Sequence, residues 1–164
     1  MTDNFTEDSG IGQIAMACAS EAVDFARDNF KLVLDWSDDS VAHVETMLGV
    51  FHDQLAEADP GEEKVFGIAR LFGSYVGEVF RRNHGATWGI VELGGETFPG
   101  LRAASSSWLF WPWARAQNRI RNGPEDNIQH YYQLLLQKQG DNSTPPRPDS
   151  PAQKKSWWRR LRGD

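Results

Sequence analysis

Cysteine is scarce in this sequence, and long apolar runs are absent from it. The 164 residues include one cysteine, Cys18, so no disulfide can form within the chain, and such usage is typical of a reducing compartment. No stretch reaches the roughly 18–20 uncharged apolar residues that a membrane-spanning helix needs. Residues 1–8 are acidic, whereas a secretory signal begins with a basic segment. We therefore expect a cytoplasmic protein.

Positive charge is scarce in most of the chain. The formal net charge is −6, but residues 1–139 contain 11 Lys and Arg against 20 Asp and Glu, whereas residues 140–164 contain six against three. A surface that binds nucleic acid through its phosphates needs a basic face that releases counterions. The acidic part of the chain is therefore not expected to bind nucleic acid, and this argument does not extend to residues 140–164.

Catalytic and metal-binding motifs are also missing. The segment Gly73-Ser74-Tyr75-Val76-Gly77 is one residue out of step with the G-x-S-x-G nucleophile motif and lies within a predicted helix. Cys18 lies on an apolar helical stripe, where a buried thiol is commoner than a nucleophile. The histidines lack a second His or Cys at metal-ligand spacing; they are His43, His52, His84 and His130. We predict no catalytic residue, no metal and no cofactor.

The same boundary near residue 140 divides the chain by pattern. Apolar residues make up 40% of the sequence and aromatic residues 12%, which is enough to build one core. Residues 141–153 contain four prolines and no apolar periodicity, which predicts a disordered, partly polyproline linker. We expect a single globular α+β domain over residues 1–139 and a disordered Pro-rich linker over 140–164 that ends in a basic, Trp-containing segment.

Apolar residues at steps of three and four predict several helices. They indicate helices over residues 12–29 and 37–55, the second with Ser37 as its N-cap. Between them, residues 32–36 alternate with period two and predict a short extended segment. Pro112 and Gly123 have the positions of a helix start and a helix end, and Pro124 begins a last helix.

The longest predicted helix spans residues 62–84 and is apolar around more than half of its circumference. Gly73 and Gly77 lie on one face of it, where each disfavours the helix by about 1 kcal/mol, so a close backbone approach by a neighbour is the expected compensation. Gly85 has the position of a C-cap. This helix is predicted to be central.

Residues 87–111 change to a strand pattern with a Gly94-Gly95 turn, which predicts a three-stranded antiparallel meander. The predicted fold class is α+β. A helical bundle around the long central helix packs on a small three-stranded antiparallel sheet, followed by a disordered C-terminal tail.

The densest polar cluster lies where the central helix meets the meander; it comprises Glu78, Arg81, Arg82, Asn83, His84 and Trp88. A buried Glu78 must be paired, and Arg82, Arg115 or Arg119 could pair with it, which would fix the helix against the sheet. A functional interpretation makes Arg81, Asn83, His84 and Trp88 the floor of a polar recognition site. A further alternative is a small hydrolase or ligand-binding enzyme that uses Glu78, Arg82 and His84, which requires an open cleft and a perturbed pKa.

The C-terminal segment is a second candidate for contact. Residues 154–162 combine five cations with two adjacent tryptophans, and the contact residues we select are Trp157, Trp158, Arg159, Arg160 and Arg162. Such a segment suits a membrane surface, a nucleic acid or a groove on a partner, but one this short binds weakly by itself. Peripheral membrane attachment is therefore a third alternative, beside a solubilising tail.

Three motifs resemble those of a family of small bacterial domains of unknown function: residues 71–85 with Trp88, Pro99-Gly100-Leu101-Arg102, and Asn122-Gly123-Pro124-Glu125-Asp126. The likeness covers roughly residues 20–136, and Trp111-Pro112-Trp113 departs from it by its large aromatics. The resemblance implies a bacterial cytosolic accessory protein without catalysis. We therefore expect a non-catalytic protein-interaction module, immunity-like or adaptor-like, with a protein partner and the Trp/Arg tail as an accessory contact.

Overall fold

The computed structural model describes residues 4–106 and 108–137, and it has the predicted α+β architecture. The predicted linker and tail, residues 140–164, lie outside the described residues. The elements in chain order are β1 (Phe5–Glu7), α1 (Ser9–Phe25) continued by a π-helix (Ala26–Phe30), a 3₁₀ helix (Asp38–Ser40) leading into α2 (Val41–Glu57), α3 (Glu62–His84), β2 (Ala86–Leu93), β3 (Glu96–Ala103), β4 (Leu109–Phe110), α4 (Pro112–Asn122), a 3₁₀ helix (Pro124–Asp126) and α5 (Ile128–Gln137).

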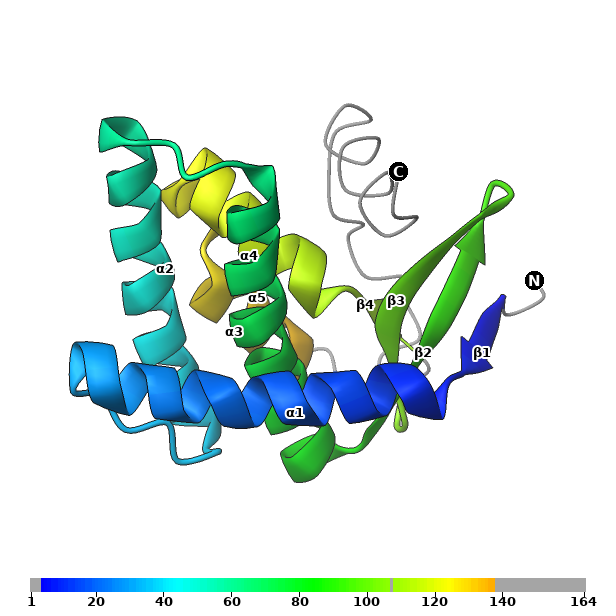
Figure 1. Ribbon diagram of the computed structural model, residues 1–164. Helices are drawn as coiled ribbons and strands as arrows, with labels where there is room; N and C mark the ends of the chain where they lie inside the picture. Colours follow the sequence, from blue (N-terminus) through cyan, green and yellow to red (C-terminus); the bar gives the residue numbers. More distant parts are fainter. Residues whose placement is uncertain (1–3, 107, 138–164) are drawn as a thin grey trace.

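Helix α3 is central, as predicted. It packs against α1 on one side and α4 on another, and α1 crosses it near the sheet (Figure 1). A Cβ atom on Gly73 would lie 2.6 Å from the backbone oxygen of Pro112, so the close backbone approach expected at this glycine is confirmed. Gly85 caps the helix with φ of +84°, a conformation that glycine adopts without strain.

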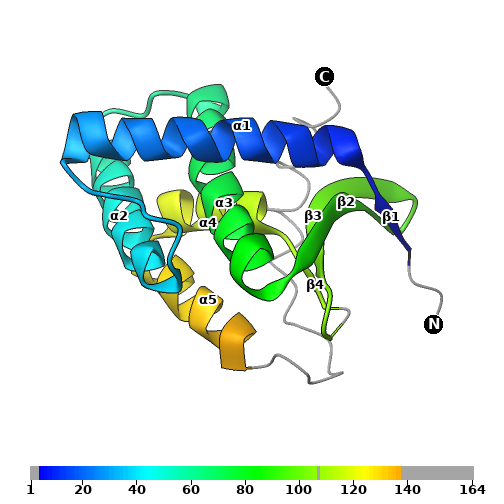
Figure 2. The ribbon, with the colours of Figure 1, turned by 90° about the horizontal axis from the view of Figure 1, so that it is seen from below.

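The sheet has four antiparallel strands in the order β1-β2-β3-β4, so the prediction of three strands is wrong by one. The additional strand β1 pairs with β2, with Phe5 opposite Val91. Strand β1 spans three residues and buries only Phe5. A strand this short shows no alternation of apolar and polar residues from which it could be predicted. The predicted turn at Gly94-Gly95 joins β2 to β3, and both glycines have positive φ. Figure 2 shows the sheet beside the helices, next to the first turn of α1.

One prediction about the first third of the chain needs correction, and two others hold. Helix α1 begins at Ser9 instead of Gly12, because the carboxylate of Asp8 accepts a hydrogen bond from the backbone N–H of Ile11 and caps the helix. Residues 32–36 alternate in burial as predicted for an extended segment, because Leu32, Leu34 and Trp36 are buried or half-buried whereas Val33 and Asp35 are exposed. Trp36, with φ of +67°, then turns the chain. Ser37 is an N-cap as predicted, and its side chain accepts a hydrogen bond from the Ser40 backbone N–H.

The core lies between α3 and the elements around it. Every residue from Phe72 to Phe80 is buried, which explains why this stretch of α3 is apolar on most sides. The buried set includes Cys18, as predicted for a thiol on an apolar stripe. In the described part of the chain, no helix has the length and apolar character needed to cross a membrane.

Candidate functional site

Glu78 is the charged centre of the junction between α3 and the sheet. Its side chain is 0% exposed, and Arg81 donates two hydrogen bonds to it, from Nε to Oε1 at 2.8 Å and from Nη2 to Oε2 at 2.9 Å. The indole N–H of Trp88 donates to Oε1 at 2.8 Å, and Arg82 Nε lies 3.4 Å from Oε2. The carboxylate thus faces four donors, which is the condition for burying a charge.

The predicted partners of Glu78 are partly corrected by this geometry. Arg82 is a secondary contact, and the main partner is Arg81, one helical turn away on the same face. Arg119 instead pairs with Glu45 of α2 at 2.6 Å, and Arg115 lies 3.9 Å from Asp126. Helix α4 therefore uses its arginines to bind α2 and the Pro124–Asp126 turn.

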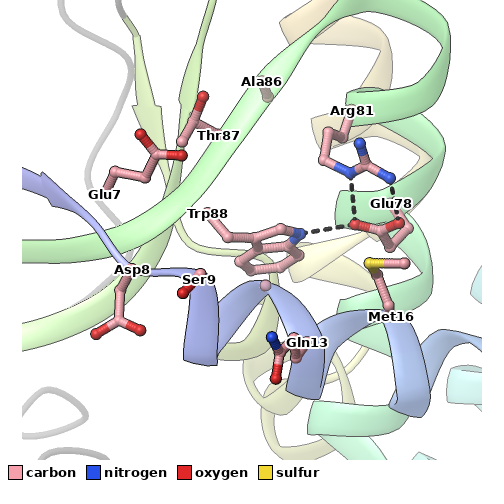
Figure 3. Close-up of a pocket in the computed structure, with 11 residues that line it drawn as sticks. Glu7, Asp8, Ser9, Gln13, Met16, Glu78, Arg81, Ala86, Thr87 and Trp88 are labelled. Carbon is pink, nitrogen blue, oxygen red and sulfur yellow. Dashed lines mark hydrogen bonds and ion pairs between the residues drawn. The ribbon is translucent and has the colours of Figure 1, made fainter.

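Gly77 allows Trp88 to reach the carboxylate. A Cβ atom at this position would lie 2.5 Å from Cζ2 of the Trp88 ring and 2.7 Å from a methyl carbon of Leu101, which is opposite Trp88 in the β2–β3 register. The absent side chain leaves room for the indole against α3. Figure 3 shows the ring between α1 and α3 with its nitrogen directed at Glu78.

The hydrogen bonds determine the ionisation of Glu78. Burial by itself raises the pKa of the carboxyl, but the bonds from Arg81 and Trp88, together with the charges of Arg81 and Arg82, outweigh burial and hold the pKa below its ordinary value. Glu78 is therefore an ionised, fully bonded carboxylate at neutral pH. General acid or base catalysis needs a group whose pKa lies near the working pH and whose oxygens can reach a substrate, and Glu78 has neither property.

A second carboxylate, Asp38, organises the opposite side of the α3 terminus. It accepts hydrogen bonds from the Tyr132 hydroxyl at 2.5 Å, from His84 Nε2 at 2.9 Å and from Asn83 Nδ2 at 3.2 Å. Its side chain is 32% exposed. Burial raises the pKa of Asp38, but the bonds from Tyr132, His84 and Asn83 together outweigh burial and lower it. Burial and the bond to Asp38 raise the pKa of Tyr132.

The predicted polar cluster is therefore divided between two sides of α3. Glu78, Arg81 and Trp88 meet on the side of α1 and β2. On the other side, the Arg82 guanidinium stacks 3.6 Å above the Trp36 ring while also approaching Glu78, and Asn83 donates to the Trp36 carbonyl oxygen at 2.9 Å. His84 binds Asp38 there. Arg81, Asn83, His84 and Trp88 thus do not form the floor of one recognition site.

A pocket of about 330 Å³ opens beside the Glu78 centre. Its lining comes from the β1–α1 junction, the first turns of α1, the end of α3 and the start of β2 (Figure 3). The lining residues are Glu7, Asp8, Ser9, Gly12, Gln13, Met16, Glu78, Arg81, Ala86, Thr87 and Trp88. Three carboxylates and one guanidinium therefore border it, together with the apolar parts of Met16, Ala86 and Trp88.

Four residues of these sites were not predicted from the sequence: Glu7, Asp8, Asp38 and Tyr132. The first two border the pocket only because β1 joins the sheet, and that strand was not predicted. Tyr132 and Asp38 are 94 positions apart in the chain, so no local pattern brings them together. A usable signal existed for Asp8, since Asp immediately before an apolar helical stripe is a frequent N-cap.

No group of three or more His, Cys, Asp or Glu among residues 4–106 and 108–137 could hold a metal ion. The selected tail residues, Trp157, Trp158, Arg159, Arg160 and Arg162, lie outside the described part of the chain. Comparison of the chain with protein-family models, with curated proteins and with solved structures finds no match.

Proposed function

We propose that this protein is a non-catalytic protein-interaction module, adaptor-like or immunity-like, and that the pocket between α1, β2 and α3 recognises a basic segment of a protein partner. The observation that carries the proposal is the contrast within the pocket. Its floor is a closed ion pair in which Glu78 is fully bonded, whereas Glu7 and Asp8 lie at the more open edge. Such a surface suits recognition of charge better than proton transfer.

The charge of the lining selects the chemistry of the partner. Arg81 neutralises Glu78, which leaves the carboxylates of Glu7 and Asp8 as the net charge of the pocket. The first turn of α1 offsets part of this charge, because Asp8 caps a helix N-terminus that carries about half a positive charge. The remaining field is negative, so it attracts Lys and Arg and repels the phosphates of nucleic acids.

The apolar part of the lining favours a long basic side chain over a small cation. Met16 is 47% exposed at the pocket, which leaves apolar surface for a partner to cover. Lys and Arg pack an aliphatic stem on such surface while the charged head group reaches a carboxylate. A partner segment that combines basic and aromatic residues matches both the negative charge and the apolar surface of the pocket.

The alternatives of the sequence analysis receive less support. A hydrolase built on Glu78, Arg82 and His84 needs the three groups to converge, but His84 binds Asp38 on the far side of α3 from the pocket. Membrane attachment through Trp157 and Trp158 concerns residues outside the described part of the chain and stays a prediction for liposome flotation. Bacterial origin and a cytoplasmic location also stay expectations from the sequence.

Peptide titration of the full-length protein tests the proposal. Labelled peptides that differ only in net charge are titrated by fluorescence anisotropy, and we expect affinity to rise with positive charge and to fall with added salt. The double variant Glu7→Gln/Asp8→Asn should weaken the binding of a basic peptide roughly two- to thirtyfold, since two exposed pairs contribute about 0.2–1 kcal/mol each. Asn caps helices as well as Asp does, so this variant keeps α1.

A matched control removes the same charge elsewhere. Asp53 and Glu57 are exposed on the last turns of α2 and lie outside the pocket lining, so Asp53→Asn/Glu57→Gln should leave peptide affinity within twofold of the wild-type value. Affinity that does not depend on peptide charge would overturn the proposal. So would an equal loss in the control variant.

A further inference from the structure

The chain itself contains a segment with the chemistry that the pocket selects. Residues 154–162 contain five cations and the two adjacent tryptophans Trp157 and Trp158. We infer that this basic tail, Lys154–Arg162, binds in the pocket of its own molecule and that a partner must displace it. The inference rests on the proposed function, because it assigns a ligand to the same pocket.

Charge complementarity is the first support for this assignment. Residues 1–139 carry a large excess of Asp and Glu, and residues 140–164 carry twice as many Lys and Arg as Asp and Glu. At the pocket, Glu7 and Asp8 provide the unneutralised charge, while Met16 and Ala86 provide apolar surface beside it. An indole with a neighbouring guanidinium can cover such surface and place its charge near the carboxylates.

The length of the connection is the second support. Helix α5 ends at Gln137, and the seventeen positions from there to Lys154 can span about 55 Å when extended. A domain of this size has a radius of gyration of about 14 Å. The tail can therefore reach any face of the domain, including the β1–α1 junction.

Because the tail is tethered to the domain, a weak contact is sufficient for it to occupy the pocket. A segment linked to its site by a short connection experiences an effective concentration of about a millimolar, so a contact with a millimolar dissociation constant is already about half occupied. A partner that competes for the pocket then binds with an apparent affinity reduced by the occupied fraction. The tail would thus set a threshold for partner binding.

Disulfide trapping in the full-length protein tests the contact directly. Cys18 is first replaced by Ala, and new cysteines are introduced by Gln13→Cys at the pocket and Ser156→Cys in the tail. The matched control pairs Ser156→Cys with Ala56→Cys, an exposed position on α2. Equilibrium with a glutathione buffer measures the effective concentration of each pair. We expect the pocket pair to exceed the control at least about tenfold.

Three results of the trapping experiment would contradict the inference that the tail binds in the pocket. Equal effective concentrations for the two pairs would overturn the inference. Disulfide-linked dimers that form in proportion to protein concentration would overturn binding within one molecule. Flotation of the tail with anionic vesicles, together with a pocket pair no better than the control, would assign the tail to lipid and would also overturn it.

A second measurement separates this inference from the proposed function. The basic peptide is titrated into wild-type protein and into a tail variant, Trp157→Ser/Trp158→Ser/Arg159→Ser/Arg160→Ser. If the tail occupies the pocket, the tail variant binds the peptide several-fold more tightly than the wild type does. Equal affinities that both fall in the Glu7→Gln/Asp8→Asn background overturn the tail inference alone. Binding by the tail variant that ignores peptide charge overturns the proposed function as well.

Discussion

Two carboxylates on opposite sides of the α3 terminus use different means to remain ionised. Glu78 is 0% exposed and has its partners within ten positions in the chain: Arg81, Arg82 and Trp88. Asp38 is 32% exposed and binds Tyr132, His84 and Asn83, which come from α5 and from the end of α3. The pKa of each carboxyl is lowered although burial opposes the shift in both.

The comparison shows how exposure determines the consequence of losing a partner. A fully buried carboxylate that loses a donor cannot replace it with water, so its desolvation remains uncompensated. A third of the Asp38 side chain reaches solvent, so water can replace a lost donor there. We therefore expect the Glu78 side to be sensitive to substitution and the Asp38 side to be tolerant.

The largest expected effect is that of Arg81→Met. This change removes two hydrogen bonds to Glu78 and leaves the buried carboxylate with the Trp88 bond and the longer, 3.4 Å contact to Arg82, so the free energy of unfolding should fall by about 3 kcal/mol or more. Urea denaturation measures the difference. The control Arg27→Met breaks the ion pairs with Asp24 and Asp28, whose members are all more than 60% exposed, and should leave the free energy of unfolding nearly unchanged. Equal losses in the two variants would invalidate the comparison.

Gly77→Ala should be the next most harmful change on the Glu78 side. The new Cβ atom would lie 2.5 Å from the Trp88 ring, so the indole must move away from Glu78, and stability should fall by about 2 kcal/mol. Gly67→Ala on the same helix is the control, because a Cβ atom there meets nothing within 4 Å and the higher helix propensity of Ala should stabilise by up to about 1 kcal/mol. Thermal and urea unfolding should give opposite signs for the two variants, and equal signs would contradict this account.

Tyr132→Phe probes the Asp38 side with a smaller expected effect. The variant loses one hydrogen bond to a charged but partly exposed acceptor, so the free energy of unfolding should fall by about 1.5 kcal/mol. A double-mutant cycle with Asp38→Asn should show a favourable coupling energy between the two side chains, since they contact each other directly. A loss as large as that of Arg81→Met would mean that exposure does not separate the two sides.

The smallest expected effect appears in the dependence of stability on pH. The folded-state pKa of Asp38 lies below its ordinary value, so its contribution is complete above about pH 4 and is lost as the pH falls through the folded-state pKa. Below pH 4, Asp38→Asn should therefore lose stability less steeply than the wild type. Identical slopes for the wild type and Asp38→Asn would remove Asp38 from the acid response.

Much of the helical part could be predicted because its signals are local. The bounds of α3, the cap at Gly85 and the start of α4 at Pro112 follow from apolar periodicity and from the backbone preferences of glycine and proline. The burial of Glu78 and its need for arginine could also be inferred, since a charge within an apolar stripe must be paired. Its main partner, Arg81, lies one turn away and was available to the same argument.

The division of the polar cluster between two sides of α3 could be predicted in part from the sequence. Glu78 and His84 are separated by six positions, which places them about 120° apart around the axis of an α-helix. Helical geometry therefore already opposed a single site containing both residues. It could not show that His84 binds Asp38, because that contact joins two helices.

The sequence by itself determined most of the helices, the caps at Ser37 and Gly85 and the acidic character of residues 1–139, because these depend on neighbouring residues and on composition. Only the tertiary structure decided the fourth strand, the Asp38–Tyr132 contact and the pocket at the β1–α1 junction. Each of these brings together segments that are far apart in the chain. Their geometry depends on how the elements pack, and packing is set by the shapes of many side chains at once, so no local pattern encodes it.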